Sequence, residues 1–281
     1  MKNNFMENPT TEVQFTPYEI SFCLYDIHRT AQWKQAIEDV VKEGDVVVDA
    51  GAGTGILGVF AALDEAKHVY SIELHERFCR LISNLAKRNG VENKVTVIKG
   101  DASKAEIPEK IDVLICELLS TGQFFEPEIQ VVNHLRKYFN EGARIIPQKV
   151  ESFIQLLDAD EIIYGVKIDT DSRSLLLPDD EPVSTIEKYN TIDLTQPIPL
   201  NVDTTVKVKA RKTRIADAVV ITSRAYLTKT QVTERTKFLY NPEVIFLKNP
   251  INLIKGKEYE IHISYPYGSD TLDAIIEVNP L

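Results

Sequence analysis

The arrangement of apolar and polar positions divides the chain into three parts. Between about residues 12 and 43, Trp33, Ile37, Val40 and Val41 recur at helical spacing, which predicts at least one helix before the first strand. From residue 46 to about 147, β-branched runs alternate with stretches of helical length. The predicted strands are 45–51, 68–74, 94–101 and 111–117, and the predicted helices are 55–66 and 76–90. This alternation predicts a parallel sheet covered on both faces.

The pattern changes after Pro147. Short, partly alternating, β-branched segments follow, separated by turn signals, and they predict an antiparallel barrel or sandwich; they are 204–210, 218–228, 242–248, 259–265 and 273–279. Residues 169–190 show weak periodicity with many acids and prolines, and we expect an irregular connection there. The predicted parts are an N-terminal helical segment, 1–45, an α/β domain, 46–147, and a β domain, 148–281.

Composition excludes several classes of protein. With 43% hydrophobic and 26% charged residues among 281, the chain is typical of soluble globular proteins. It has no apolar run near the roughly 18 residues of a membrane helix, and its polar start is unlike a signal peptide, so we expect a cytoplasmic protein. The spacing of its three cysteines and five histidines matches no zinc motif, so we expect no metal site. Cys116 is either a packed thiol at a strand end or a catalytic thiol.

The formal net charge of −10 argues against a broad nucleic-acid surface, which requires clustered Lys and Arg. The charge fits the attraction of a cationic substrate, and it also fits an acidic surface that keeps the protein soluble.

A glycine-rich turn follows the first predicted strand. Gly51, Gly53 and Gly55 precede a helix, which is the arrangement that lets a ligand approach backbone N–H groups at a helix N-terminus. The segment therefore predicts a site for a nucleotide-type cofactor. Because residues 53–58 also satisfy the pattern GxGxxG, a dinucleotide remains one alternative.

Three acids at predicted strand ends favour S-adenosylmethionine. Asp49 would repel a pyrophosphate but suits the amino-acid part of this cofactor. Glu73 ends the second strand, where a carboxylate can accept from both ribose hydroxyls, and Asp101 follows the third strand, near the expected adenine edge. Each acid taken alone is also compatible with helix capping or simple solvation.

Two further carboxylates frame a short aromatic loop, "CELLSTGQFFEPE". Glu117 ends the fourth strand and should lie near the sulfonium methyl, and Glu126 follows after a loop that can fold back. A guanidinium has a pKa above about 12 and is a poor nucleophile, so two carboxylates would orient it and draw charge from the attacking nitrogen. Phe124 and Phe125 would wall this slot. Alternatively, Glu126 before Pro127 simply begins a helix.

These segments resemble the protein arginine N-methyltransferase family over nearly the whole chain. The cofactor loop is "VVVDAGAGTGIL", the ribose-binding acid lies in "YSIEL", and the two-glutamate loop is "CELLSTGQFFE". "YEISFCLYDIH" is similar to the family's N-terminal cofactor lid, with Tyr18, Tyr25 and His28 as the nearest counterparts. "ARIIPQ" resembles the junction to the family's second domain. The resemblance implies a Rossmann-like class I methyltransferase domain followed by an antiparallel β-barrel.

Pattern and resemblance together assign candidate site residues. The catalytic candidates are Glu117 and Glu126, and the cofactor-binding candidates are Tyr25, His28, Asp49, Gly51, Gly53, Thr54, Gly55, Glu73, Leu74, Asp101, Ala102 and Glu117.

The sequence also departs from the family pattern. Tyr240 and Asn241 occupy the place of the family's threonine-histidine-tryptophan loop, and the arginine that holds the cofactor carboxylate has no clear counterpart, its approximate position being Ile37. Leu118 and Leu119 replace the tryptophan and methionine after the first glutamate, and the connection after Asp158 is too short for the full dimerisation arm.

Several acceptors and functions therefore stay open. The expected activity is methylation of a guanidino or amino nitrogen in a protein or in a small cationic metabolite. A non-catalytic cofactor-binding scaffold and a dinucleotide-dependent oxidoreductase are the rival classes. The expected partners are a cationic substrate and, as one open assembly, a second copy in a homodimer; neither nucleic acid nor a membrane is expected.

Overall fold

The structure is a computed structural model that describes residues 17–159, 162–168 and 170–281. Two helices, α1 (Pro17–Tyr25) and α2 (Ile27–Val40), precede the first strand, as expected. The elements of the α/β domain that follow are β1 (Val46–Ala50), α3 (Ile56–Leu63), β2 (His68–Glu73), α4 (Glu76–Arg88), β3 (Val95–Lys99), β4 (Ile111–Cys116), η1 (Thr121–Gln123), α5 (Glu128–Leu135), η2 (Arg136–Tyr138) and β5 (Phe139–Ile146).

The first sheet is parallel throughout and has the order β3-β2-β1-β4-β5. Side chains of a strand alternate between its faces. Val48 of β1 accordingly joins the core cluster that contains α5, whereas Val47 joins the cluster that contains Trp33 of α2 and Leu57 of α3. Both faces are therefore covered, which confirms the predicted Rossmann-like layer. The fifth strand, β5, adds to the four that the pattern predicts.

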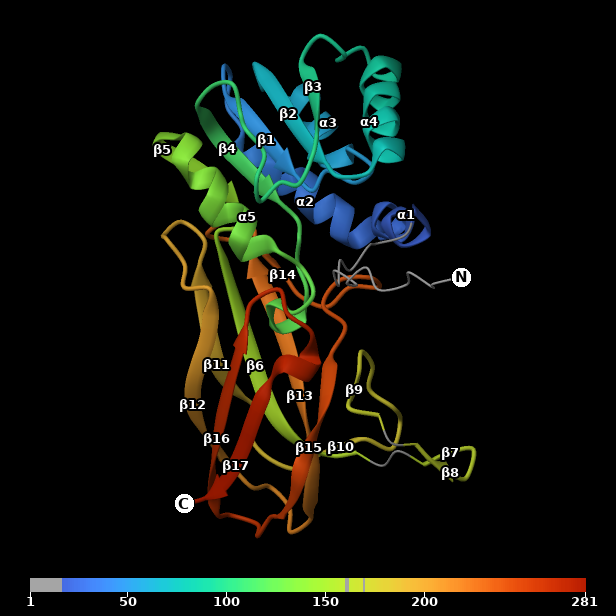
Figure 1. Ribbon diagram of the computed structural model, residues 1–281, viewed down its shortest axis with the longest axis vertical. Coiled ribbons are helices and arrows are strands. Elements are labelled where there is room, and N and C mark those ends of the chain that lie inside the picture. The colour runs from blue at the N-terminus through green and yellow to red at the C-terminus, as the bar shows by residue number, and fades with distance from the viewer. Residues whose placement is uncertain (1–16, 160–161, 169) are drawn as a thin grey trace, which may run out of the picture.

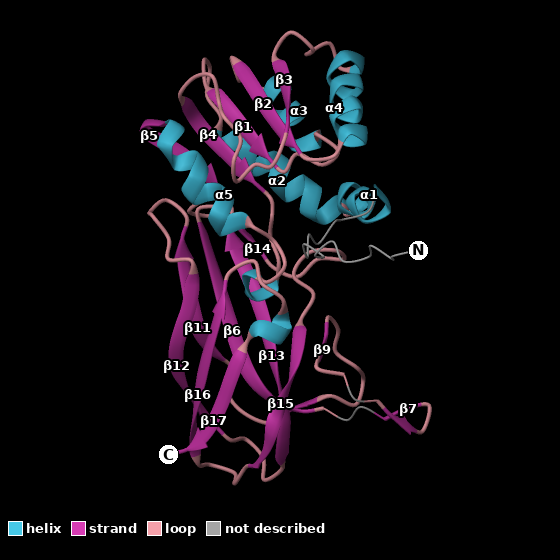
Figure 2. Ribbon diagram, in the orientation of Figure 1, coloured by secondary structure: helices cyan, strands magenta, loops and turns pink. Residues whose placement is uncertain are grey.

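The remaining strands form the β domain (Figures 1 and 2). They are β6 (Lys149–Asp158), β7 (Ile162–Ile163), β8 (Val166–Lys167), β9 (Ser172–Arg173), β10 (Glu181–Pro182), β11 (Glu187–Asp193), β12 (Asn201–Lys209), β13 (Ile215–Tyr226), β14 (Val232–Thr233), β15 (Glu243–Asn252), β16 (Glu258–Pro266) and β17 (Ile275–Pro280), with η3 (Thr271–Asp273) between the last two.

These strands pair mainly in two antiparallel sheets. One contains β10, β6, β13, β15 and β9, with β11 on β6 and β14 on β13, and the other has the order β12-β16-β17. The two sheets adjoin where β11 lies beside β12 and β15 beside β17, and Ile154 and Ile261 of the two sheets share one core cluster. The predicted antiparallel domain after the parallel one is thus confirmed.

The segment 169–190 corrects one expectation. It contains β9, β10 and the start of β11, not an irregular connection throughout. β9 and β10 have two residues each, and β11 has a register shift between Lys188 and Asn190. Pairings that short and irregular leave no periodicity to detect in the sequence.

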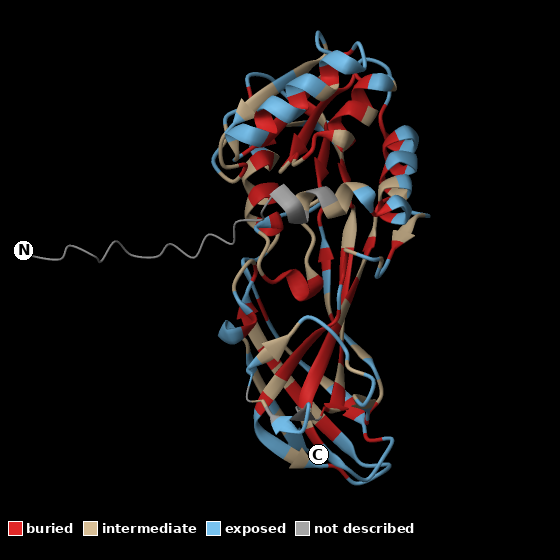
Figure 3. Ribbon diagram, turned by 90° about the vertical axis from the view of Figure 1, so that its right-hand side faces the viewer, coloured by how far each residue is buried: buried red, intermediate tan, exposed pale blue. Residues whose placement is uncertain are grey.

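One hydrophobic core spans both domains. It runs from Val48 and Leu114 of the parallel sheet through Ile129 of α5 to Ile154 and Ile261 of the β domain. Figure 3 shows buried positions along the strands of both parts. The β domain is therefore packed against the α/β domain beside α5 and the loop that precedes it.

Candidate active site

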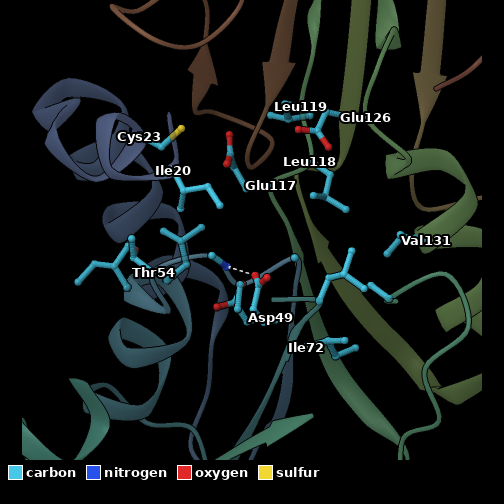
Figure 4. A pocket seen from close by; sticks show the side chains of 18 of the residues that line it. Ile20, Cys23, Asp49, Thr54, Ile72, Glu117, Leu118, Leu119, Glu126 and Val131 are labelled. Atoms are coloured by element: carbon cyan, nitrogen blue, oxygen red, sulfur yellow. Dashed lines mark hydrogen bonds between the residues drawn. The ribbon is translucent and has the colours of Figure 1, made fainter. Parts of the chain in front are cut away.

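A cavity of about 300 Å³ opens at the carboxyl ends of the parallel strands (Figure 4). Its walls come from α1, α2, the turns after β1, β2, β3 and β4, the start of α5, and Phe238 and Leu239 of the β domain. In open α/β sheets the ligand crevice lies at this edge. The segments singled out by the sequence therefore meet at one place.

The glycine turn shapes the floor of the cavity. Gly51 and Gly53 line it with φ values of 72° and 53°, a left-handed region that side chains disfavour. A Cβ on Gly51 would lie 2.5 Å from Leu118 Cδ2. Thr54 also lines the cavity, but Gly55 does not. A Cβ on Gly55 would meet Ile82 Cγ1 at 2.7 Å, so this glycine serves helix packing rather than the expected ligand contact.

Asp49 lies at the inner end of the cavity and is buried. Its Oδ2 accepts a hydrogen bond from the backbone N–H of Gly58, 2.9 Å away. Burial, opposed by that hydrogen bond and reinforced by Glu73 and Glu117, raises the pKa of Asp49 to about 7. A cationic group such as an ammonium beside this buried side chain would offset the burial and favour the ionised carboxylate.

The other two strand-end acids also line the cavity, together with Leu74 and Ala102. Glu73 accepts from the N–H groups of Gly53 and His75, each at 2.8 Å, and this fixes both carboxylate oxygens. Asp101 accepts from Ser103 N at 2.8 Å. Burial alone would raise the pKa of Asp101, but the hydrogen bonds from Ser103 and Lys104 together outweigh it and lower the pKa. Asp101 thus caps a turn and also lies in the cavity wall.

Arg29 is a site residue that the sequence patterns left unassigned. Its Nε donates to Glu117 Oε1 at 3.1 Å, its Nη2 forms an ion pair with Glu117 Oε2, and its Nη1 donates to Cys23 O at 3.2 Å. Arg29 lines the cavity and is almost fully buried. Ile37, the approximate position given to the missing arginine, is instead fully buried in the apolar core.

The signal for Arg29 was present in helix α2. Arg29, Trp33, Ile37 and Val40 form one buried face at helical spacing. An arginine on an apolar stripe needs a paired carboxylate, because an unpaired buried charge is costly.

The helical lid presents different residues from those expected. Ile20, Cys23 and Leu24 of α1 line the cavity. Tyr25 is 71% exposed and His28 is exposed as well, and neither lines the cavity. Positions 20, 23 and 24 share one face of a helix, and Tyr25 lies off that face. The side chain of Tyr18 lies outside the described residues.

Glu117 and Glu126 line the same cavity, at the end away from Asp49 in Figure 4. Burial and the neighbouring charge of Glu117 raise the pKa of Glu126 to about 8. Glu126 directly precedes Pro127, the N-cap of α5, so it lies at the helix start and in the cavity wall at the same time. The two carboxylates therefore lie in the wall of one cavity, near enough for the charge of Glu117 to raise the pKa of Glu126.

The expected aromatic walls are absent from this slot. Phe124 is fully buried and stacks on Tyr265 with ring centroids 4.1 Å apart, and neither Phe124 nor Phe125 is among the residues that line the cavity. Leu118, Leu119 and Leu239 form the apolar wall instead. Phe124 anchors the loop in the core through this stacking.

A third carboxylate, Glu128, lies behind this wall and was not foreseen. It is fully buried and accepts a hydrogen bond from Gln123 Nε2. Burial, with Glu117 and Glu126 nearby, raises its pKa well above the ordinary value. Burial also raises the pKa of Cys116 far above that of a free thiol, which supports a packed thiol over a nucleophile.

The segment that replaces the histidine loop lies next to the two-glutamate loop. Asn241 O accepts from Thr121 Oγ1 at 2.6 Å, and Tyr240, at φ 55°, is buried. Its hydroxyl has no hydrogen-bond partner among the described residues. Burial, together with Glu128 and Glu117, raises the pKa of Tyr240, so it remains a neutral phenol.

Neither a metal site nor a membrane helix emerges from the described parts of the chain. No group of three or more His, Cys, Asp or Glu side chains there is arranged to hold a metal ion. No helix among the same residues is long and apolar enough to cross a membrane.

Residues 20–155 match the family model of the TRM5/TYW2 methyltransferase domain. The chain is 35% identical over 249 residues to the uncharacterized protein MJ1452 of Methanocaldococcus jannaschii, which covers 88% of this chain and 91% of that protein. It is 34% identical over 139 residues to protein arginine N-methyltransferase 1 of Oryza sativa, covering 48% of this chain and 36% of that one. Protein arginine N-methyltransferase 6 of Xenopus laevis is 36% identical over 132 residues, covering 46% and 38%. The chain thus matches little more than a third of these two arginine methyltransferases.

Solved structures show the same fold over both domains. The Trypanosoma brucei PRMT1 enzyme-prozyme heterotetrameric complex with AdoHcy aligns with a TM-score of 0.75 at 17% identity, covering 94% of this chain and 98% of that chain. Arabidopsis thaliana protein arginine methyltransferase 10 aligns with a TM-score of 0.72 at 15% identity, covering 94% and 99%. The parallel-sheet domain and the antiparallel domain therefore occur together in this order in known proteins.

Proposed function

Because the chain belongs to the S-adenosylmethionine-dependent methyltransferases, in one family with protein MJ1452 and with the fold of the protein arginine methyltransferases, we propose that it methylates a guanidino or amino nitrogen. The observation that carries this proposal is the meeting of Glu117 and Glu126 in the cavity that the glycine turn lines. A cationic nitrogen group is the ligand that two adjacent carboxylates favour.

The residues around the glycine turn fit the cofactor. Gly51 and Gly53 leave the space that a Cβ would fill and, with Thr54, form a cradle beside the helix N-terminus of α3. In our proposal Asp49 holds the amino group, Glu73 the ribose hydroxyls, and Asp101 with Leu74 and Ala102 the adenine side. When bound, S-adenosylmethionine supplies an electrophilic methyl group.

Arg29 completes this proposed cofactor site. It lines the cavity and pairs with Glu117, and its charge partly offsets the burial of Asp49. A guanidinium binds a carboxylate through two parallel hydrogen bonds, so Arg29 would hold the cofactor carboxylate while it stays paired with Glu117.

The two glutamates perform the acceptor chemistry in this proposal. Glu117 and Glu126 hold the N–H groups of the acceptor and place one nitrogen toward the transferable methyl, which supplies orientation and electrostatic stabilisation. A guanidinium or ammonium nitrogen loses one proton when it gains a methyl group. Glu126, with its pKa raised to about 8, is suited to accept that proton.

The acceptor is a protein arginine or a small cationic metabolite. Tyr240, a buried neutral phenol in place of the family's histidine, adds no charge to the slot and so does not distinguish these two acceptors.

A homodimer belongs to the same proposal. The β7–β8 hairpin projects from the β domain in Figure 1, and its turn residue Tyr164 is fully exposed.

Transfer of a labelled methyl group tests the proposal. Purified protein and labelled S-adenosylmethionine are added to a lysate of cells that lack this gene, and the products are then separated by size. Label recovered as methylarginine from the protein fraction identifies a protein substrate, and label in the small-molecule fraction identifies a metabolite.

Glu126→Gln serves as the control in the same lysate. Label that appears equally with this variant, or cofactor binding with no label in either fraction, would contradict the proposal. The second outcome would instead support a non-catalytic scaffold.

A further inference from the structure

The two-glutamate loop is held at its middle by side chains of the β domain. Gly122 N donates to Ser223 Oγ of β13 at 2.9 Å, and Tyr265 Oη of β16 donates to Gly122 O at 2.6 Å. Both backbone polar groups of one buried loop residue are therefore satisfied by side chains from distant strands. Gly122 lies between Glu117 and Glu126, the two carboxylates of the slot.

These two contacts are part of a larger buried network. Ser223 Oγ hydrogen-bonds Ser152 Oγ of β6 at 2.9 Å, and Tyr265 Oη hydrogen-bonds Tyr189 Oη of β11 at 2.6 Å. All four side chains are buried. Since β6, β11, β13 and β16 belong to the folded β domain, the network offers the loop a rigid base.

The loop itself has a conformation that needs such support. Gly122, Gln123 and Phe125 have φ values of 68°, 61° and 64°, and two of these residues carry side chains. A non-glycine residue in this region costs free energy that the surrounding contacts must offset. A Cβ on Gly122 would lie 2.7 Å from Phe124 Cε2, the ring that stacks on Tyr265. Only glycine permits both the turn and the stacking.

We propose that Ser223 and Tyr265 are positioning residues that fix the two-glutamate loop so that Glu126 faces Glu117 across the acceptor slot. This inference rests on the proposed function of that slot. It assigns the β domain a part in the chemistry beyond binding the acceptor. It also separates two kinds of ligand, because the network holds the loop that leads to Glu126, while the proposed cofactor residues come from the α/β domain and its helices.

The test compares two matched tyrosine variants. Tyr265→Phe removes the hydroxyl that holds Gly122 O. Tyr267→Phe removes a buried hydroxyl whose partner is Asn190 Nδ2, 2.9 Å away, and not the loop. The probes are ethylguanidinium, titrated into protein saturated with S-adenosylhomocysteine, and S-adenosylhomocysteine itself, both followed by calorimetry or NMR.

We expect Tyr265→Phe to weaken ethylguanidinium at least tenfold and to change S-adenosylhomocysteine affinity less than twofold. Tyr267→Phe should leave both affinities at the wild-type values. Ser223→Ala should act like Tyr265→Phe, because it releases the other backbone group of Gly122.

The pH midpoint of ethylguanidinium binding gives a second measurement. It would not change if Ser223 and Tyr265 only stabilised the fold. Glu126 must be ionised to bind a cation, so wild-type affinity should rise with pH, with a midpoint near pH 8, and level off above it. The titratable groups coupled to Glu126 are Glu117, Glu128, Cys23 and Cys116. A loosened loop lets water reach Glu126, and the midpoint should then fall in Tyr265→Phe but not in Tyr267→Phe.

A glycine pair covers the case in which Tyr265→Phe does not fold. Gly122→Ala and Gly142→Ala both place a side chain at positive φ, but a Cβ on Gly142 would meet nothing within 4 Å. Only Gly122→Ala should weaken ethylguanidinium.

The inference is overturned if Tyr265→Phe or Gly122→Ala lowers the melting temperature while ethylguanidinium affinity and its pH midpoint stay unchanged. It is equally overturned if both ligands weaken together. If wild-type binding of ethylguanidinium does not depend on Glu126, as measured with Glu126→Gln, the proposed function itself fails and this inference with it.

Discussion

Arg29 of helix α2 forms a buried ion pair with Glu117 at the end of strand β4, with Arg29 Nε 3.1 Å from Glu117 Oε1. The pair joins the N-terminal helices to the acceptor slot. Asp26, the N-cap of the same helix, accepts from Phe238 N at 3.0 Å and from Thr236 Oγ1, so the helix is also tied to the β domain. The cofactor side and the acceptor side of the cavity thus share one charged contact.

Breaking this pair should cost stability. Arg29→Met leaves Glu117, whose side chain is only 16% exposed, without its cation, and removal of one partner of a fully buried pair costs about 3–5 kcal/mol, which sets the upper bound here. We expect a loss up to that size in the free energy of unfolding, measured by urea denaturation. The double variant Arg29→Met/Glu117→Gln should recover part of the loss. If the effects of the two substitutions simply add, the pair contributes no coupling and this account of it is wrong.

The buried Glu128 predicts a pH-dependent stability. Its pKa is raised in the folded protein, so folding takes up a proton above its ordinary value of 4.5, and stability falls as pH rises beyond that value. Glu128→Gln removes this titration. The stability of the variant relative to wild type should therefore increase between pH 5 and pH 7, by at most about 1.4 kcal/mol per pH unit. Urea denaturation at several pH values gives the comparison, and a constant difference would show that Glu128 is ionised throughout.

Tyr240 predicts a stabilising substitution. Its buried hydroxyl lacks a hydrogen-bond partner among the described residues, and a buried unsatisfied group costs about 1–3 kcal/mol. Tyr240→Phe should therefore raise the free energy of unfolding by up to that amount and retain methyl transfer. A variant that loses activity without gaining stability would contradict this, since it would assign the hydroxyl to the reaction.

The glycine turn predicts a loss of cofactor affinity that is separate from backbone strain. Gly51→Ala places a Cβ against Leu118 in the cavity, whereas Gly44→Ala meets nothing within 4 Å, and both residues have positive φ. Both variants should lose similar stability, but only Gly51→Ala should weaken S-adenosylhomocysteine, by tenfold or more in calorimetry. Equal affinities would argue against the cradle.

Much of this site could be predicted from local sequence. Parallel strands end at one edge of a sheet, so the residues after each valine-rich run, including Asp49, Glu73 and Glu117, were expected to meet there. The apolar pattern predicted only the hydrophobic members of the stripe, Trp33 and Ile37. Arg29 lies on the same stripe by its helical spacing, but its charge did not match that pattern.

Other features depend on contacts that no local pattern contains. Ser223 and Tyr265 reach Gly122 across separations of 101 and 143 positions, so only the folded β domain brings them together. The sequence predicted that Phe124 would wall the slot. That prediction was wrong because Phe124 packs against Tyr265, a contact that is also non-local. The prediction that Tyr25 contacts the cofactor missed the cavity-lining residue by one position, since Leu24 lines the cavity and Tyr25 is exposed.

The most direct test of the central claim compares methyl transfer and cofactor binding in wild type, Glu117→Gln and Glu126→Gln. Transfer is measured with labelled S-adenosylmethionine, and the acceptor is the lysate fraction, protein or small-molecule, that becomes labelled with the wild-type enzyme. Binding is measured as the dissociation constant of S-adenosylhomocysteine. We predict that both variants lose transfer by at least a hundredfold, while Glu126→Gln keeps its dissociation constant within about twofold of wild type. Transfer that persists in Glu126→Gln would contradict the assignment of Glu117 and Glu126 as the groups that hold the acceptor nitrogen.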